Sequence, residues 1–146
     1  MSYIIEPLTK NFVKDVAEIE EECFSVPFKE SDILSYLEES YWRFFVARDK
    51  DKILGYVSFT IIIDEISICN VAVSPAYRRQ GIGNALIEYL LSYAKKMGVK
   101  KLFLEVRESN ISAISLYEKF GFLPVGVSKN HYSNPKENAL LMNLEI

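Results

Sequence analysis

Two side chains in the second half of the sequence have the chemistry of proton transfer. Glu105 is the one acid in the apolar, strand-like run Lys101–Val106, and it stands near the carboxyl end of that run. Tyr117 follows Asn110 by two helical turns, so both side chains are expected to face the same crevice. A carboxylate can take a proton from an amine, and a phenol can donate to a leaving group. The structural alternatives are that Glu105 pairs with Arg107 on the same strand face and that Tyr117 packs in the core.

The turn between the strand that Pro75 closes and the next helix is rich in glycine and arginine. Glycine lets the backbone approach a ligand closely, and the first N–H groups of a helix lie at the positive end of its dipole. The turn lacks the Gly-Lys-Ser/Thr ending of an ATP-binding loop and the third glycine of a dinucleotide fingerprint, and tight helix starts also use glycine. We expect it to hold a pyrophosphate through residues Arg78, Arg79, Gln80, Gly81, Ile82, Gly83 and Asn84.

Metal and thiol chemistry find little support in the sequence. Cys23 and Cys69 are the only cysteines and His131 is the only histidine, so no cluster has the spacing of a zinc site. We expect no metal and two reduced thiols. Cys69 lies within a strand-like run, where a small buried residue is favoured over a nucleophile. His131 lies in a polar segment and is expected to have an exposed or structural role.

Hydrophobic periodicity predicts the elements that position these residues. Strands are predicted over Tyr3–Pro7, Trp42–Arg48, Ile53–Ile63, Ile66–Val73, Lys101–Val106, Phe122–Tyr132 and Asn138–Glu145. Helices are predicted over Asn11–Cys23, Glu30–Glu39, Ile82–Lys96 with Gly98 as C-cap, and from the N-cap Asn110 to Phe120. The third helix lies between two strands that should be parallel, and the fold class is α/β (or α+β) with a mixed sheet of about seven strands and about four helices. The apolar loop Phe24–Phe28 either marks a binding surface or plugs the core.

Composition limits the classes of function that remain. The 146 residues, 49% of them hydrophobic, suit a single domain over residues 1–146. The net charge of −3 argues against a protein that coats nucleic acid, so any anionic ligand must be held locally. No secretory signal is visible, and the longest uncharged stretch, Ile53–Ile63, is too short for a membrane helix. We expect a cytoplasmic protein without direct contact with nucleic acid or membrane.

Several motifs together resemble the GNAT superfamily of N-acetyltransferases. The run Arg78–Gly83 resembles the Arg/Gln-x-x-Gly-x-Gly/Ala acetyl-coenzyme A loop of that superfamily, and it follows an apolar strand. The later motifs Leu104–Asn110, Ala113, Leu116-Tyr117 and Gly121-Phe122 resemble the second half of the superfamily's core. The motifs Val26–Phe28, Asp64-Glu65 and Asn130–Tyr132 look like the RimI-type enzymes, which acetylate the N-terminal alanine of a small-subunit ribosomal protein. Phe28 stands where Trp is common and His131 where Tyr is frequent; both departures lie on the acceptor side.

The resemblance implies a role for each candidate residue. It implies acetyl-CoA as co-substrate, a mostly antiparallel sheet, Glu105 as general base with Glu65 as the alternative, and Tyr117 as general acid. Asn110 would cap its helix and touch the cofactor. Backbone N–H groups of the segment Val71, Ala72 and Val73, exposed by a bulge, would stabilise the carbonyl oxygen. The walls of an acceptor groove would be Phe28, Glu65, Ile66 and Tyr132.

The first hypothesis is therefore acetyl transfer to the N-terminal α-amine of a protein, with alanine as the favoured first residue and a small-subunit ribosomal protein as the possible partner. Transfer to a lysine side chain or to a small amine such as a polyamine is the alternative within the same class. A non-catalytic acyl-CoA-binding module is the alternative from another class, and the presence of both Glu105 and Tyr117 argues against it.

Overall fold

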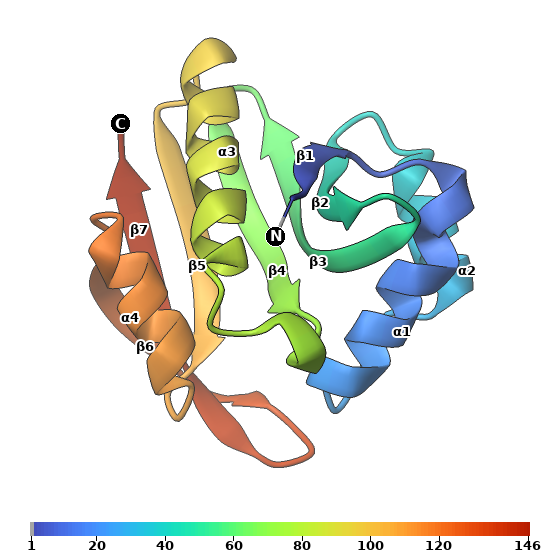
Figure 1. The fold of residues 1–146 in the computed structure, drawn as a ribbon. Helices are drawn as coiled ribbons and strands as arrows, with labels where there is room; N and C mark the ends of the chain where they lie inside the picture. Colours follow the sequence, from blue (N-terminus) through green and yellow to red (C-terminus); the bar gives the residue numbers. More distant parts are fainter. Residues whose placement is uncertain (1) are drawn as a thin grey trace.

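Seven strands form one sheet in the computed structural model, which describes residues 2–146 (Figure 1). The strands lie in the order β1-β2-β3-β4-β5-β7-β6, and every neighbouring pair is antiparallel except β4 and β5. Their bounds are β1 Ile4–Pro7, β2 Trp42–Asp49, β3 Lys52–Ile62, β4 Glu65–Val73, β5 Lys101–Arg107, β6 Leu123–Tyr132 and β7 Glu137–Glu145. The predicted fold class, with its single parallel pair, is confirmed.

Helices cover both faces of this sheet. They are α1 Val13–Cys23, α2 Glu30–Leu37, α3 Ile82–Lys96 and α4 Ile111–Lys119, with short 3-10 turns at Lys10–Phe12 and Pro75–Tyr77. Alternate residues of β2 point to opposite faces, so Phe44 packs in the core beneath α1 and α2 while Phe45 packs in the core that contains α3. The predicted bounds differ from these by a few residues at the element ends.

The helix α3 joins the two parallel strands and has the predicted buried face. Most of its apolar residues at helical spacing are buried, with Leu86, Ile87 and Leu90 fully so, while Leu91 is only partly buried. The helix ends at Lys96, Met97 is its C-cap, and Gly98 follows with a φ of +74°. The prediction took Gly98 as the C-cap itself. The C-cap is instead Met97, because the left-handed residue of such an ending lies just beyond the cap.

The parallel strands β4 and β5 are paired over only part of their length. Pairing runs from Glu65 opposite Lys101 to Ile68 opposite Leu104, although both strands continue beyond this point. In β4 the register with β3 shifts at Cys69, which is the extra residue of a bulge. The bulge was expected from the resemblance and lies just before the Val71–Val73 segment. The two strands therefore part at their carboxyl ends, toward the bottom of Figure 1.

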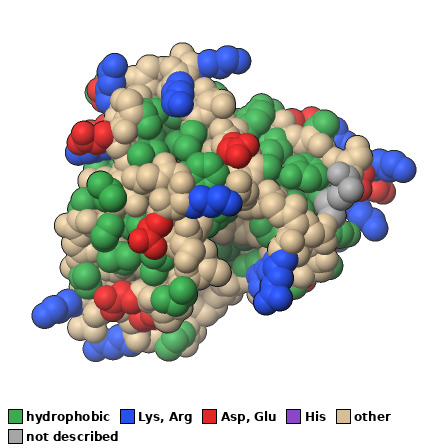
Figure 2. Space-filling model, turned by 60° about the vertical axis from the view of Figure 1, so that its left-hand side comes forward, with side chains coloured by type: hydrophobic (Ala, Val, Ile, Leu, Met, Phe, Trp, Pro, Cys, Tyr) green, Lys and Arg blue, Asp and Glu red, His purple; other side chains and the backbone are tan. Residues whose placement is uncertain are grey.

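The last two strands form a hairpin at the edge of the sheet. The strand β7 inserts between β5 and β6, and the hairpin extends past the end of β5 in Figure 1. On the face drawn in Figure 2, acidic and basic side chains are intermixed among apolar ones. None of the helices within residues 2–146 has both the length and the apolar character needed to cross a membrane.

Candidate active site

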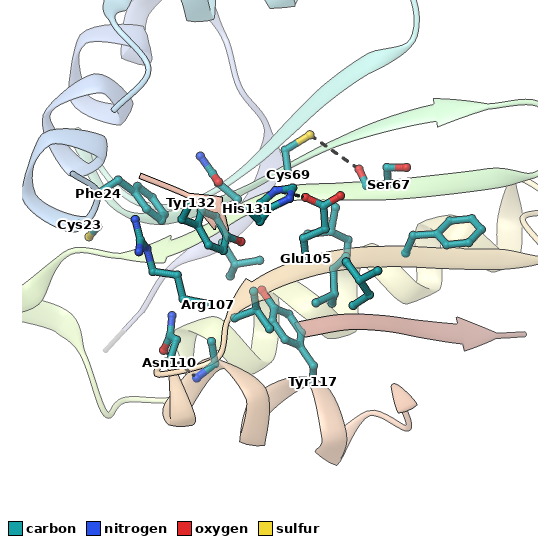
Figure 3. Close-up of a pocket in the computed structure, with 18 of the residues that line it drawn as sticks. Cys23, Phe24, Ser67, Cys69, Glu105, Arg107, Asn110, Tyr117, His131 and Tyr132 are labelled. Atoms are coloured by element: carbon teal, nitrogen blue, oxygen red, sulfur yellow. Dashed lines mark hydrogen bonds and ion pairs between the residues drawn. The ribbon is translucent and has the colours of Figure 1, made fainter. Parts of the chain in front are cut away.

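A cavity of about 930 Å³ lies where β4 and β5 part (Figure 3). Five segments contribute to its walls: the loop between α1 and α2, the middle of β4, β5, one face of α4 with its N-cap, and the β6–β7 hairpin. These segments are far apart in the sequence, and the gap in β4–β5 pairing is what lets side chains from all of them meet. Open α/β sheets place ligands at such carboxyl ends of strands.

Glu105 points into this cavity from β5 and is bound by a histidine. Its Oε2 lies 2.6 Å from His131 Nε2, and the two side chains are 52% and 33% exposed. Arg107, the partner considered from the sequence, instead binds Glu137 at 3.1 Å. The predicted alternative of a Glu105–Arg107 pair is therefore wrong, because the hairpin supplies both residues with other partners.

Tyr117 reaches the same cavity from α4 and is almost fully buried. Asn110 caps that helix, with Oδ1 accepting from the Ala113 N–H at 3.2 Å. Asn110, Ala113 and Tyr117 all line the cavity, so the prediction that they share one face is confirmed. Burial, and secondarily the neighbouring Tyr132, raises the pKa of the Tyr117 phenol above its usual range. The phenol therefore keeps its proton at neutral pH and can donate it.

Neither cysteine near the cavity is a ready nucleophile. Burial, and then the adjacent Glu105 carboxylate, raises the pKa of the Cys69 thiol to about 11. Burial also raises the pKa of the Cys23 thiol, against the opposing effect of Arg78. Both groups are therefore protonated at neutral pH. Within residues 2–146 no group of three or more His, Cys, Asp or Glu side chains could hold a metal ion.

Two of the four predicted acceptor walls line the cavity. Phe28 does so from the α1–α2 loop, edge-on to Tyr36 at 5.2 Å, and Tyr132 does so from the hairpin beneath the Arg107 guanidinium at 4.5 Å. The other two do not. Ile66 is fully buried and Glu65 lines a separate hollow of about 310 Å³.

The positions of Glu65 and Ile66 correct the sequence interpretation. Both lie at the amino end of β4, where it pairs with β5, whereas the residues of β4 that line the cavity begin at Ser67. Glu65 therefore lies outside the cavity that Tyr117 lines, and Glu105 is the candidate base that shares this cavity with the phenol.

A buried carboxylate lies behind the cavity wall and was missed by the sequence analysis. Glu20 of α1 is fully buried; its Oε1 accepts from the Phe28 N–H at 2.7 Å and its Oε2 from Asn70 Nδ2 at 2.9 Å. Burial raises the pKa of this carboxyl to about 6, against the lowering effect of the two hydrogen bonds. The helical spacing of Glu20 from Val16 and Val13, which places it on the apolar face, was the available signal.

The predicted anion-binding turn lies at the start of α3, beyond the cavity's lining. Gly81 is the N-cap with a φ of +80°, Arg79 also has a positive φ of 63°, and no side chain among residues 2–146 caps this helix. Arg78 is held in place: Nε donates to the Val73 carbonyl at 3.1 Å and Nη2 to Cys23 Sγ at 3.2 Å. The helix therefore presents uncapped N–H groups beside an anchored guanidinium.

The remaining residues of the predicted set have mixed positions. Val71 lines the cavity, whereas Ala72 and the Ile82 side chain are buried in the two cores, so only their backbone groups can serve a ligand. Gln80 is exposed, and Val73, Gly83 and Asn84 are partly buried.

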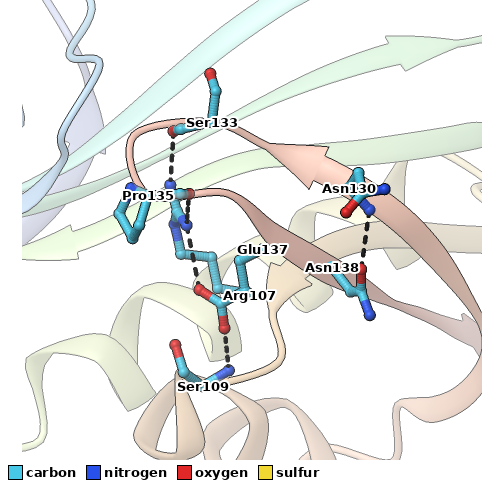
Figure 4. A network of polar contacts seen from close by, with 7 residues as sticks. All are labelled: Arg107, Ser109, Asn130, Ser133, Pro135, Glu137 and Asn138. Atoms are coloured by element: carbon cyan, nitrogen blue, oxygen red, sulfur yellow. Dashed lines mark hydrogen bonds and ion pairs between the residues drawn. The ribbon is translucent and has the colours of Figure 1, made fainter.

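A polar network ties the hairpin to the rest of the site (Figure 4). Arg107 Nη1 donates to Glu137 Oε1 at 3.1 Å and to the Pro135 carbonyl at 2.9 Å, and Nη2 donates to the Ser133 carbonyl at 3.2 Å. Glu137 also accepts from the Ser109 N–H at 2.7 Å. Hydrogen bonds from Ser109, and after them Arg107, lower the pKa of the Glu137 carboxyl. The network fixes the segment that carries His131 and Tyr132.

Comparison with known proteins places this geometry in a family. The model of the Acetyltransferase (GNAT) family matches residues 13–122. The [Ribosomal protein bS18]-alanine N-acetyltransferase of Escherichia coli (strain K12) is 37% identical over 130 residues, 88% of this chain and 87% of that protein. A putative enzyme of the same name from Bacillus subtilis (strain 168) is 37% identical over 131 residues, 89% of this chain and 87% of that protein. The crystal structure of the Escherichia coli ribosomal-protein-S18-alanine N-acetyltransferase has a TM-score of 0.91 and 33% identity, covering 99% of this chain and 94% of that one.

Proposed function

Since the chain belongs to the Acetyltransferase (GNAT) family, and is thus an acyltransferase, we propose that it acetylates the N-terminal α-amine of a protein. The proposed acceptor is the N-terminal alanine of a small-subunit ribosomal protein, and the reaction would then take place in the cytoplasm. The observation that carries the proposal is the meeting of Glu105 and Tyr117 in one cavity between the parted ends of β4 and β5. The relatives that bear this activity in their names match the chain over most of its length.

Acetyl-CoA is the proposed acetyl donor, and two features suit it. Beyond Ile68 and Leu104 the facing edges of β4 and β5 have no strand partner, so their amides can bond an amide-bearing arm laid between them. The uncapped start of α3, with Gly81 and the arginine pair, can hold a pyrophosphate. Asn110, at the edge of the cavity, can touch the same molecule.

In the proposed reaction the acceptor amine attacks the thioester carbonyl directly. The C–N bond forms and the C–S bond breaks; Glu105 takes the proton that the nitrogen loses, and Tyr117 supplies a proton to the departing sulfur. Backbone N–H groups of the segment after the Cys69 bulge would stabilise the carbonyl oxygen. The protonated thiol of Cys69, with a pKa of about 11, supports direct attack rather than an acyl-cysteine intermediate.

A small set of acceptors tests the proposal. The purified chain is incubated with acetyl-CoA and a peptide that begins with alanine and contains one lysine, with the same peptide blocked at its α-amine, and with a polyamine. Mass spectrometry with fragmentation is expected to find acetyl only on the free α-amine. Acetylation of the lysine or the polyamine alone would assign the enzyme another acceptor. Binding of acetyl-CoA with no product from any acceptor would contradict catalysis itself.

A further inference from the structure

The single histidine of the chain connects the candidate base to the hairpin. His131 Nε2 lies 2.6 Å from Glu105 Oε2, and its Nδ1 lies 3.3 Å from Ser128 Oγ. The imidazole also packs edge-on against Tyr132, with ring centroids 4.8 Å apart. Both ring nitrogens thus have a polar partner, and one of these partners is the carboxylate to which the proposed function gives the proton (Figure 3).

We propose that His131 is a positioning residue for Glu105, an inference that rests on the proposed function. A neutral imidazole with its proton on Nε2 donates to Oε2 of Glu105, while the Ser128 hydroxyl donates to Nδ1 and fixes that tautomer. One oxygen of the carboxylate is then held by His131. The other is left for the acceptor amine, because the Glu105 side chain lines the cavity and is 52% exposed. Orientation of a base by a third group is a recurring arrangement in acid–base catalysis.

The hairpin is braced at the point where this arrangement needs rigidity. Arg107, two residues after Glu105 on β5, binds two hairpin carbonyls and Glu137 (Figure 4). The Asn130 N–H, next to His131, donates to Asn138 Oδ1 at 2.9 Å. The backbone on both sides of His131 is therefore tied to β5 or β7, so the imidazole is presented to Glu105 rather than left free on a surface strand.

Steady-state kinetics of hairpin variants test the inference. His131→Phe removes the donor to Glu105 and is expected to lower kcat by roughly tenfold to a hundredfold, the effect of one hydrogen bond to a charged group, with the KM for acetyl-CoA unchanged. His131→Gln can still donate a hydrogen bond to the Glu105 carboxylate, so it should keep most of kcat. Lys129→Gln, an exposed change on the same strand, is the matched control and should match the unmodified protein.

A spectroscopic readout tests the geometry without relying on activity. Because the chain has one histidine, its ¹⁵N imidazole signals are unambiguous. The Nε2–H tautomer is expected at high pH, with loss of that preference in Ser128→Ala. A Nδ1–H tautomer in the unmodified protein would overturn the inference.

The kinetic outcomes separate this inference from the proposed function. A wild-type kcat in His131→Phe, together with an impaired Glu105→Gln, would refute the role of His131 alone. A change in His131→Phe confined to the KM for the peptide would make His131 a wall of the acceptor site and also refute it. Wild-type rates in both variants would instead remove Glu105 as the base, and the proposed mechanism with it.

Discussion

The buried carboxylate of Glu20 predicts a specific pH dependence of stability. Its partners are the Phe28 N–H and the Asn70 amide, with no cation bound to it among residues 2–146. Folding therefore moves this carboxyl from water into a site that disfavours its charge, and its pKa rises from 4.5 to about 6. The folded state then binds the proton more tightly than the unfolded state does.

The sign and size of the effect follow from this difference. Below the unfolded value of 4.5 the carboxyl is protonated in both states and costs nothing. As the pH rises through 4.5 and then 6, ionisation becomes harder in the folded protein, so the free energy of unfolding falls by about 2 kcal/mol and stays lower at higher pH. Glu20→Gln removes the ionisation and should remove this decline.

Urea unfolding at a series of pH values from 4 to 8 measures the effect. The difference in unfolding free energy between Glu20→Gln and the unmodified protein should shift in favour of the variant by about 2 kcal/mol across that range. Glu21→Gln, the exposed neighbour on the same helix, is the control and should show no such shift. The same difference in unfolding free energy at every pH would mean that the folded protein does not raise the pKa of Glu20, and it would refute the reasoning.

Four further changes test the proposed site. Glu105→Gln should lower kcat by roughly 10²- to 10⁴-fold with acetyl-CoA affinity unchanged, and the loss should shrink as pH approaches the amine's pKa near 8, since less base is then needed; a pH-rate series checks this. Tyr117→Phe should also lower kcat but without that rescue, and equal rescue of both variants would contradict the division of roles. Gly81→Val introduces a β-branched residue at a φ of +80° in the proposed pyrophosphate turn, so calorimetry on the folded variant should find a weaker Kd for acetyl-CoA, and unchanged affinity would sink that assignment. Arg107→Met releases the hairpin and should raise the KM for the peptide while leaving acetyl-CoA affinity intact; Lys136→Met, an exposed change in the same hairpin, is its control, and equal effects of the two would refute the brace.

The parts of the fold that were predictable are those fixed by neighbours in sequence. The spacing of Leu86, Ile87 and Leu90 specifies the buried face of α3, and Gly98 marks its end. The strand, helix and strand around α3 then require a parallel pair, because a helix that returns the chain to the same end of the sheet leaves no other orientation. The common face of Asn110 and Tyr117 follows from the same helical geometry.

The parts that were not predictable depend on contacts between distant segments. The sequence of β7 does not indicate that this strand inserts between β5 and β6. The position of the hairpin, and with it the pairing of His131 with Glu105, could therefore not be predicted. The prediction of Glu65 and Ile66 as walls of the acceptor groove was wrong for a related reason. Glu65 and Ile66 belong to the strand that lines the cavity, but the lining begins only at Ser67, and this limit depends on the surrounding elements rather than on the sequence of β4 itself.

The same division separates the two sides of the site. The groups proposed to handle acetyl-CoA lie on the strand, helix and strand around α3 and on α4, whereas the two positions that depart from the RimI-type pattern, Phe28 and His131, lie on the α1–α2 loop and the hairpin. Each of these acceptor walls is fastened by one carboxylate: Glu20 holds the loop and Glu137 holds the hairpin. Their environments are opposite, since burial raises the pKa of Glu20 to about 6 while Ser109 and Arg107 lower that of Glu137. As the pH falls, Glu20 should therefore gain its proton first, while Glu137 stays charged.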